Sequence, residues 1–127
     1  MSLNYLLDVN TLLTAIWSTH PQHETTFNWL AGKKVTVCPL AELGFLRISS
    51  NAKAINVPME KARRALNLFL TERQAKRIPD DLPALESSPQ KSDEVTDSYL
   101  ADLAARHGLK LATLDHRIKH PAVVLVG

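Results

Sequence analysis

The sequence predicts an α/β protein, a three-layer α/β/α sandwich with a mainly parallel central sheet. Short apolar runs alternate along the chain with segments of helical periodicity, which is the pattern of repeated strand and helix units. The apolar runs are continuous, as expected for strands that are covered on both faces. With 127 residues, 45% of them hydrophobic and 22% charged, the chain suits one globular domain spanning residues 1–127.

The first half of the chain carries two strand-like runs, and each is followed by helical segments. The first run stops at Asp8, and the second stops before Pro39. Gly32 is expected to end the helix that precedes the second run. The expected elements are strands at 3–7 and 35–38 and helices at 11–17, 22–31 and 40–48.

The second half begins with a long basic helix that starts at Pro58. Its expected inward stripe consists of Met59, Ala62, Ala65, Leu66, Leu68 and Phe69. Residues 78–95 contain three prolines and several acids, so this stretch is expected to be mostly loop. Thr96 is the expected N-cap of a helix that continues to Arg106, and Gly108 follows as its stop. The last two expected strands are 109–114 and 122–126.

Composition limits the compartment and the partners. Cys38 is the single cysteine, which excludes an internal disulfide and a cysteine-rich zinc site. The N-terminus lacks a basic region followed by an uninterrupted apolar stretch, so we expect neither a signal peptide nor a membrane span. We therefore expect the protein to be cytoplasmic.

The charges are distributed unevenly along the chain. Net charge is only +2, but residues 51–77 hold seven Lys or Arg against two acids, and residues 78–102 hold one Lys against seven acids. The basic segment is compatible with a polyanionic partner, although such a run is more often a solvated face.

Four acids are candidates for one catalytic cluster. Asp8 and Asp115 each follow a predicted strand, where the functional crevice of a parallel sheet lies. Glu42 and Asp97 each fall in the first turn of a predicted helix on the same rim. Crowded carboxylates repel one another unless a cation neutralises them, and all-oxygen donors favour Mg²⁺, with Mn²⁺ as a substitute. A metal held there can activate water for attack on a phosphodiester.

Each acid also has a purely structural interpretation, as a helix cap, a first-turn charge or a turn residue. Asp102 is an acid that we exclude from the catalytic cluster. It lies five positions after Asp97 on a different helical face and is expected to pair with Arg106 at the surface. The five histidines show no metal-ligand spacing and are expected to be surface or cap residues. Trp17, Trp29 and Phe27 are expected mainly to pack in the core.

Four stretches of this sequence resemble the PIN domain, in particular the VapC toxins of bacterial toxin-antitoxin systems. They cover nearly the whole chain in order: LLDVNTLL at 6–13, CPLAELGFLR at 38–47, TDSYLADLA at 96–104 and ATLD at 112–115. The resemblance implies a magnesium-dependent endoribonuclease that cleaves structured RNA. It also implies inhibition by a VapB-type antitoxin and a homodimer.

The resemblance carries specific roles for individual residues. Asp8, Glu42, Asp97 and Asp115 match the four family acids in order, with Asp8, Asp97 and Asp115 as metal ligands. Asn10 and Thr113 occupy polar positions that support the cluster. Arg47 and Arg117 are weaker candidates for contacts with RNA phosphates.

Two other functions remain open at this point. One is a catalytically silent PIN-like module that binds RNA or protein, which the complete set of acids disfavours. The other is a phosphohydrolase of the haloacid dehalogenase type, because Asp8 to Thr11 superficially resembles its Asp-x-Asp-x-Thr loop. Asn10 stands where that chemistry needs a second carboxylate.

Overall fold

A five-stranded parallel sheet forms the centre of the protein. The computed structural model describes residues 4–87, 89 and 91–127, and its strands lie in the order β3-β2-β1-β4-β5. The elements in chain order are β1 (Asn4–Leu7), α1 (Val9–Ile16), α2 (His23–Trp29), β2 (Lys34–Val37), α3 (Pro39–Ser50), α4 (Met59–Glu72), β3 (Lys76–Arg77), the 3₁₀ turns η1 (Ala84–Glu86) and η2 (Ser92–Glu94), α5 (Val95–Arg106), β4 (Lys110–Thr113) and β5 (Val123–Leu125). The predicted α/β fold class is confirmed.

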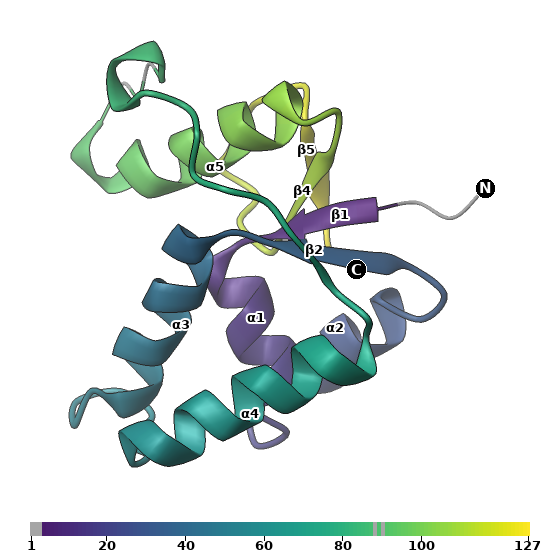
Figure 1. Ribbon diagram of the computed structural model, residues 1–127, viewed down its shortest axis with the longest axis vertical. Coiled ribbons are helices and arrows are strands. Elements are labelled where there is room, and N and C mark those ends of the chain that lie inside the picture. The colour runs from purple at the N-terminus through teal and green to yellow at the C-terminus, as the bar shows by residue number, and fades with distance from the viewer. Residues whose placement is uncertain (1–3, 88, 90) are drawn as a thin grey trace.

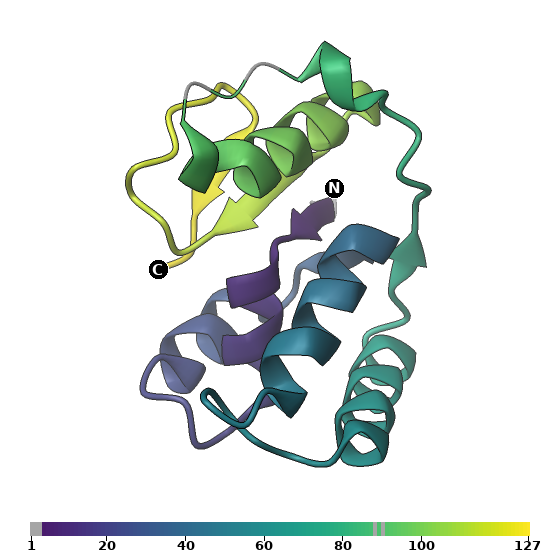
Figure 2. The same cartoon turned by 90° about the vertical axis from the view of Figure 1, so that its left-hand side faces the viewer.

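The direction of the strand order explains how the helices are distributed. From β1 the chain moves outward through β2 to β3, and it then returns to the other side of β1 for β4 and β5. Right-handed crossovers require connections in opposite directions to cover opposite faces of the sheet. Accordingly, α1 to α4 lie on one side of the sheet and α5 lies on the other (Figure 1; Figure 2). The strand order reverses between β1 and β4, which makes their carboxyl ends the expected place for a functional crevice.

The central strands are buried on both faces, as their continuous apolar runs predict. Consecutive residues Leu6 and Leu7 of β1 are both 0% exposed, and so are Leu111 and Ala112 of β4. Since successive side chains point to opposite faces of a sheet, both faces must be covered at this point. No helix within the described ranges is both long and apolar enough to cross a membrane.

Helix α3 packs closely against the start of α1 because residue 44 is glycine. A Cβ atom at Gly44 would lie 2.5 Å from Cγ2 of Val9. A larger residue at position 44 would therefore require the Val9 side chain or one of the two helices to shift. This contact fixes α3, which carries Glu42, relative to the residues that follow β1.

The basic segment departs from the predicted single helix. α4 ends at Glu72, and Lys76 and Arg77 form the short edge strand β3, paired in parallel with β2. Charged side chains at a sheet edge discourage pairing with other chains. The predicted inward stripe is also partly wrong, because Met59 is 47% and Leu68 is 58% exposed. The buried positions of α4 are Ala62, Leu66 and Leu70.

Two smaller predictions are corrected near α5. The helix begins at Val95 rather than after Thr96, and its N-cap residue Glu94 makes no side-chain cap hydrogen bond. The predicted loop at 78–95 contains the turns η1 and η2, while residues 88 and 90 lie outside the described residues. Leu3, included in the predicted first strand, also lies outside them. Gly108 adopts a positive φ of 69° after α5, as expected for a residue that ends a helix.

Candidate active site

Asp8 lies at the carboxyl end of β1 and caps α1. Its Oδ1 accepts the backbone N–H of Thr11 at 2.8 Å, which satisfies one of the free amides at the helix start. The side chain is buried, with only 3% of the residue exposed. Burial raises the pKa of the Asp8 carboxyl, hydrogen bonds from Thr113 and Thr11 oppose this, and the charge of Asp115 raises the pKa further. Asp8 is thus a rigidly held carboxylate in an unfavourable environment for its charge.

Thr11 contributes a second link that sequence reasoning missed. Its hydroxyl donates to the carbonyl of Ala112 in β4 at 3.0 Å, and it is fully buried. The spacing of Asp8 and Thr11, three residues apart at a strand end, is the signal of an N-cap and could have identified the pair. The two residues together fix the start of α1 against the end of β4.

Asp115 lies two residues beyond β4 and is bound by a neighbouring arginine. The backbone N–H of Asp115 donates to Oγ1 of Thr113 at 3.1 Å, which connects Asp115 to the same hydroxyl that acts on Asp8. Arg117 Nε donates to Oδ1 of Asp115 at 3.0 Å and Nη2 donates to Oδ2 at 2.9 Å. This bidentate pair holds the pKa of Asp115 below its usual range. The guanidinium neutralises one acid of the cluster from the protein's own chain.

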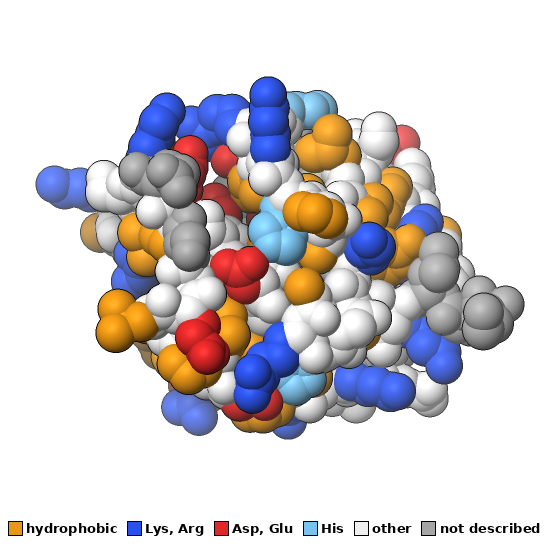
Figure 3. Space-filling view, turned by 90° about the horizontal axis from the view of Figure 1, so that it is seen from above, with side chains coloured by type: hydrophobic (Ala, Val, Ile, Leu, Met, Phe, Trp, Pro, Cys, Tyr) orange, Lys and Arg blue, Asp and Glu red, His pale blue; other side chains and the backbone are white. Residues whose placement is uncertain are grey.

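Asp97 is near the start of α5 and completes a group of three acids. Burial raises its pKa to about 6, and the charges of Asp8 and then Asp115 raise it as well. The charges of Asp8 and Asp115, which follow β1 and β4, thus act on Asp97 near the start of α5. Seen from above, acidic side chains lie in a hollow between basic ones (Figure 3). A cavity of about 220 Å³ is lined by residues that include Asp97, Asp115 and Arg117.

Glu42 lies beside a cation from the edge strand β3. Its Oε2 lies 3.9 Å from Nε of Arg77, the residue that also forms the edge strand β3. Burial raises the pKa of Glu42, Arg77 opposes the rise, and Asp80 adds to it. The charges that act on Glu42 therefore come from the β3 side of the sheet. Asp8, Asp97 and Asp115 are not among the charges that shift the pKa of Glu42, and the convergence of all four acids stays a prediction.

The other predicted residues differ in their relation to the cluster. Thr113 is fully buried, its hydroxyl accepts the backbone N–H of Asp115, and it lowers the pKa of Asp8, while its supporting role stays a prediction. Asn10 and Arg47 are exposed on α1 and α3, and neither has a side-chain hydrogen bond or ion pair among the described residues. Arg117 is next to the acids, with 79% of its side chain exposed, so its guanidinium is free to reorient.

The donor set of the cluster fits a hard divalent cation. Asp8, Asp97 and Asp115 offer only carboxylate oxygens, which Mg²⁺ and Mn²⁺ prefer. Burial is the largest cause of the raised pKa values of Asp8 and Asp97, and neighbouring carboxylates raise them further. Within the ranges that the structure describes, no three His, Cys, Asp or Glu side chains are close enough to hold a metal ion together. A shared cation therefore requires the side chains to move closer, and for Asp115 this includes release from Arg117.

Asp102 differs from its prediction. It does not pair with Arg106, because Oδ1 of Asp102 accepts Nε2–H of His120 at 2.8 Å, and Arg106 lies 3.4 Å from Asp81. Both members of the new pair are partly buried, with side chains 30% and 24% exposed. His120 is thus not a free surface residue, and Asp102 takes part in a contact between α5 and the loop before β5.

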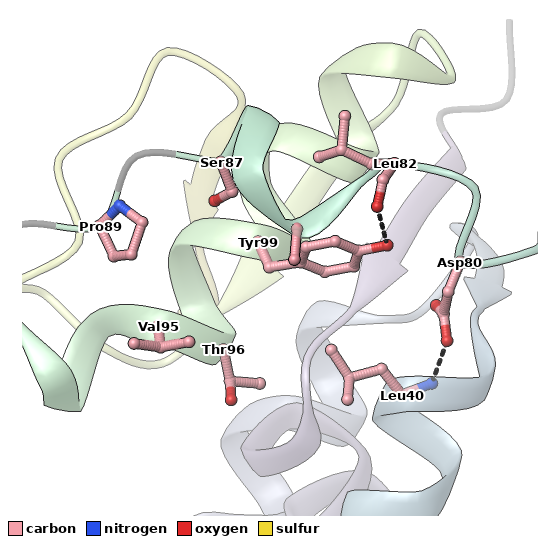
Figure 4. Close-up of a pocket in the computed structure, with 9 residues that line it drawn as sticks. Leu40, Asp80, Leu82, Ser87, Pro89, Val95, Thr96 and Tyr99 are labelled. Atoms are coloured by element: carbon pink, nitrogen blue, oxygen red, sulfur yellow. Dashed lines mark hydrogen bonds between the residues drawn. The ribbon is translucent and has the colours of Figure 1, made fainter.

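A second cavity, of about 400 Å³, lies between α3, α5 and the preceding loop that contains Asp80 and Leu82 (Figure 4). Its lining is mainly apolar. At its rim, Asp80 accepts the backbone N–H of Leu40 at 3.0 Å, and the hydroxyl of Tyr99 donates to the carbonyl of Leu82 at 2.8 Å. Nearby Cys38 is buried, which raises the pKa of its thiol to about 12 and makes it a poor nucleophile.

Comparison with known proteins gives a consistent family match. The model of the family described as PIN domain matches residues 5–124. Ribonuclease VapC38 of Mycobacterium tuberculosis is 33% identical over 123 residues, covering 87% of this chain and 84% of that protein. Ribonuclease VapC39 of the same species is 33% identical over 121 residues, covering 87% of each chain. A solved structure, VapBC2 from Rickettsia felis bound to a DNA fragment from their promoter, has a TM-score of 0.64 at 17% identity and covers 97% of both chains.

Proposed function

This chain belongs to the PIN-domain family, and on that basis we propose that it is a metal-dependent endoribonuclease, the toxin of a VapBC-type pair. The group of Asp8, Asp97 and Asp115 at the reversal of the strand order is the observation that carries the proposal. Full-length relatives that are named ribonucleases support RNA as the substrate. Structured RNA is the proposed substrate class.

Magnesium is the proposed cofactor, with manganese as a substitute. Asp8, Asp97 and Asp115 would hold it, since their carboxylates are the hard oxygen donors of the cluster. Bound there, the cation supplies activation of water and stabilisation of charge on the phosphodiester. Because the proposed mechanism uses metal-activated water, it requires no covalent nucleophile, and the buried Cys38 thiol is unsuited to that role.

Each residue of the cluster has its own proposed role. Asp8 is kept in one orientation by its cap bond to Thr11, and Thr113 bridges toward Asp115. Asp97 projects from the start of α5 into the same group. Glu42 is the fourth proposed catalytic acid and has no proposed role as a metal ligand.

Four polar residues have weaker assigned roles. Thr113 and Asn10 support the cluster, with the physical case strongest for Thr113 because of its two contacts. Arg117 and Arg47 are the proposed contacts with RNA phosphates. Arg117 is the stronger of the two because its guanidinium already lies beside Asp115.

A VapB-type antitoxin and a second copy of this chain are the proposed protein partners. The antitoxin proposal rests on family membership and on the similarity in fold to a chain of the VapBC2 structure from Rickettsia felis. The exposed basic side of α4, with Arg63 and Arg64, suits an acidic segment. Exposed Leu85 and Val95, near the apolar cavity, are candidates for the contact between two copies. We propose that the protein acts in the cytoplasm.

The direct test is incubation of the purified protein with total RNA in magnesium or in EDTA. We expect cleavage only with magnesium, and at least about a 100-fold loss in Asp8→Asn and in Asp97→Asn, since even residues that merely support metal ligands cost 10- to 100-fold. Asn at position 8 keeps an oxygen for the helix cap, so folding should be preserved. Glu24→Gln, at an exposed position of α2, is the matched control and should retain full activity.

Three results would overturn the proposal or replace it. Cleavage that survives EDTA, or that persists in both aspartate variants, excludes the metal-dependent mechanism. Retention of RNA without metal-dependent cleavage identifies a silent binding module. Turnover of a small phosphomonoester, lost in Asp8→Asn, identifies the phosphohydrolase.

A further inference from the structure

The loop between β4 and β5 carries Asp115 at one end and His120 at the other. Both ring nitrogens of His120 take part in hydrogen bonds, one with Ala122 and the other with Asp102 of α5. Nδ1 accepts the backbone N–H of Ala122 at 3.0 Å, and Nε2 lies 2.8 Å from Oδ1 of Asp102 on α5. Because Nδ1 accepts a hydrogen bond, the proton of the neutral ring is on Nε2, which donates to Asp102. The imidazole is therefore fixed in both tautomer and orientation.

Asp102 lies on the same helix as Asp97, five residues further along. The hydrogen bond to His120 thus joins α5, which carries Asp97, to the loop that carries Asp115. A cavity of about 460 Å³ is lined by residues that include Asp97, Asp102 and His120. The contact and Asp97 consequently line the same hollow. The hydrogen bond is partly shielded from water, because the two side chains are 30% and 24% exposed.

The chain contains a second Asp–His pair that serves as a natural comparison. Nε2 of His107, at the end of α5, also lies 2.8 Å from its partner, Oδ1 of Asp81. This second pair connects α5 to the preceding loop at residue 81 and has no member in the loop at 115–121. The two pairs match in chemistry and distance and differ in which elements they join.

We propose that Asp102 and His120 form a positioning pair that holds the Asp115 loop against α5 and so keeps Asp115 near enough to Asp97 for their side chains to close on a divalent cation. This inference rests on the proposed function, because it assigns a task at the same site. Neither residue needs to touch RNA or the cation. Removing either one frees the loop, so that the two carboxylates no longer share a fixed geometry.

The test measures binding of Mn²⁺ to the full-length protein, by calorimetry or by the electron paramagnetic resonance of free Mn²⁺, in the absence of RNA. His120→Ala and Asp102→Ala should each weaken Mn²⁺ binding by about 10-fold, the lower end of the range for residues that orient metal ligands. The double variant should be no weaker than the worse single variant, because both substitutions remove one interaction. His120→Gln, whose amide can still donate to Asp102, should recover part of the affinity.

His107→Ala is the matched control. It should lower the melting temperature about as much as His120→Ala while leaving the affinity for Mn²⁺ within about twofold, since it removes one comparable hydrogen bond. Equal losses of affinity in both histidine variants, or no loss in His120→Ala and Asp102→Ala, would overturn the positioning role. If His120→Ala does not fold, Asp102→Ala compared with His107→Ala supplies the same test.

Failure of the proposed function gives a different result. A wild-type protein that binds Mn²⁺ but cleaves no RNA contradicts the ribonuclease proposal, while the affinities of the variants still decide the positioning role. A wild-type protein that binds no Mn²⁺ overturns the positioning role itself.

Discussion

Asp97 and Glu42 are both helix-borne acids with raised pKa values, but the charges around them differ. Glu42 has a cation close by, with Arg77 Nε at 3.9 Å, and that cation opposes the effect of burial. The charges that act most strongly on Asp97 are those of Asp8 and Asp115, which add to the effect of burial and bring its pKa to about 6. The nearby charge thus opposes the effect of burial at Glu42, whereas the two nearest carboxylate charges add to it at Asp97.

Asp115 represents a third arrangement within the same small region. Its carboxylate is bound by both guanidinium nitrogens of Arg117, and its pKa is lowered. Arg117 also acts on Asp97, but more weakly than the two aspartates do. A single flexible cation therefore offsets only part of the charge in the cluster. The contrast with Glu42 supports the proposal that the aspartates, and not the glutamate, bind a cation.

The largest effect that tests this contrast is expected in Glu42→Gln. If Glu42 supports the site without binding metal, RNA cleavage should fall by about 10- to 100-fold, less than in Asp8→Asn. Binding of Mn²⁺ should change by less than the cleavage rate does. A loss of metal affinity as large as that of Asp97→Asn would show that Glu42 turns into the cluster and would remove the contrast.

The dependence of stability on pH separates Asp97 from Asp115. Because folding raises the pKa of Asp97, its stabilising contribution is complete near pH 4 and is lost as pH rises through about 6. In EDTA, Asp97→Asn should be more stable than wild type at pH 7.5 by about 1–2 kcal/mol, an amount reduced by the partial exposure of the group. The two proteins should converge near pH 4.

Urea unfolding at several pH values measures this difference. Asp115→Asn should show the opposite sign, because folding lowers the pKa of Asp115 and its contribution is present at neutral pH and lost in acid. If Asp97→Asn and Asp115→Asn shift stability in the same direction at pH 7.5, the two acids do not differ in the way described.

The smallest effect concerns Arg117. Arg117→Gln releases Asp115 from its internal cation, so Mn²⁺ should bind about two- to fivefold more tightly, in line with the modest energy of an exposed ion pair. Affinity for RNA should fall in the same variant if the guanidinium also contacts phosphate. Arg106→Gln, which removes a comparable exposed pair with Asp81, is the control and should leave Mn²⁺ binding unchanged. Weaker metal binding in Arg117→Gln would mean that Arg117 organises the cluster instead of competing for it.

The sequence by itself determined the fold class and the positions of Asp8 and Asp115. Continuous apolar runs mark strands buried on both faces, and an acid directly after such a run must lie near the carboxyl edge of the sheet. These are local signals, because they depend on neighbours within a few residues. The family resemblance added Asp97, which the structure brings into the same group.

Tertiary structure decided which charges meet. Arg77 is far from Glu42 in the sequence, and only the formation of β3 beside β2 brings the two together. Helical spacing suggested Arg106 as the partner of Asp102, but the packing of the β4–β5 loop on α5 supplies His120 instead. An ion pair depends on distances across the fold, and a one-dimensional spacing rule contains only the distances within one helix. The sequence therefore identified the candidate acids, but it did not predict the side chains that pair with Glu42 and Asp102.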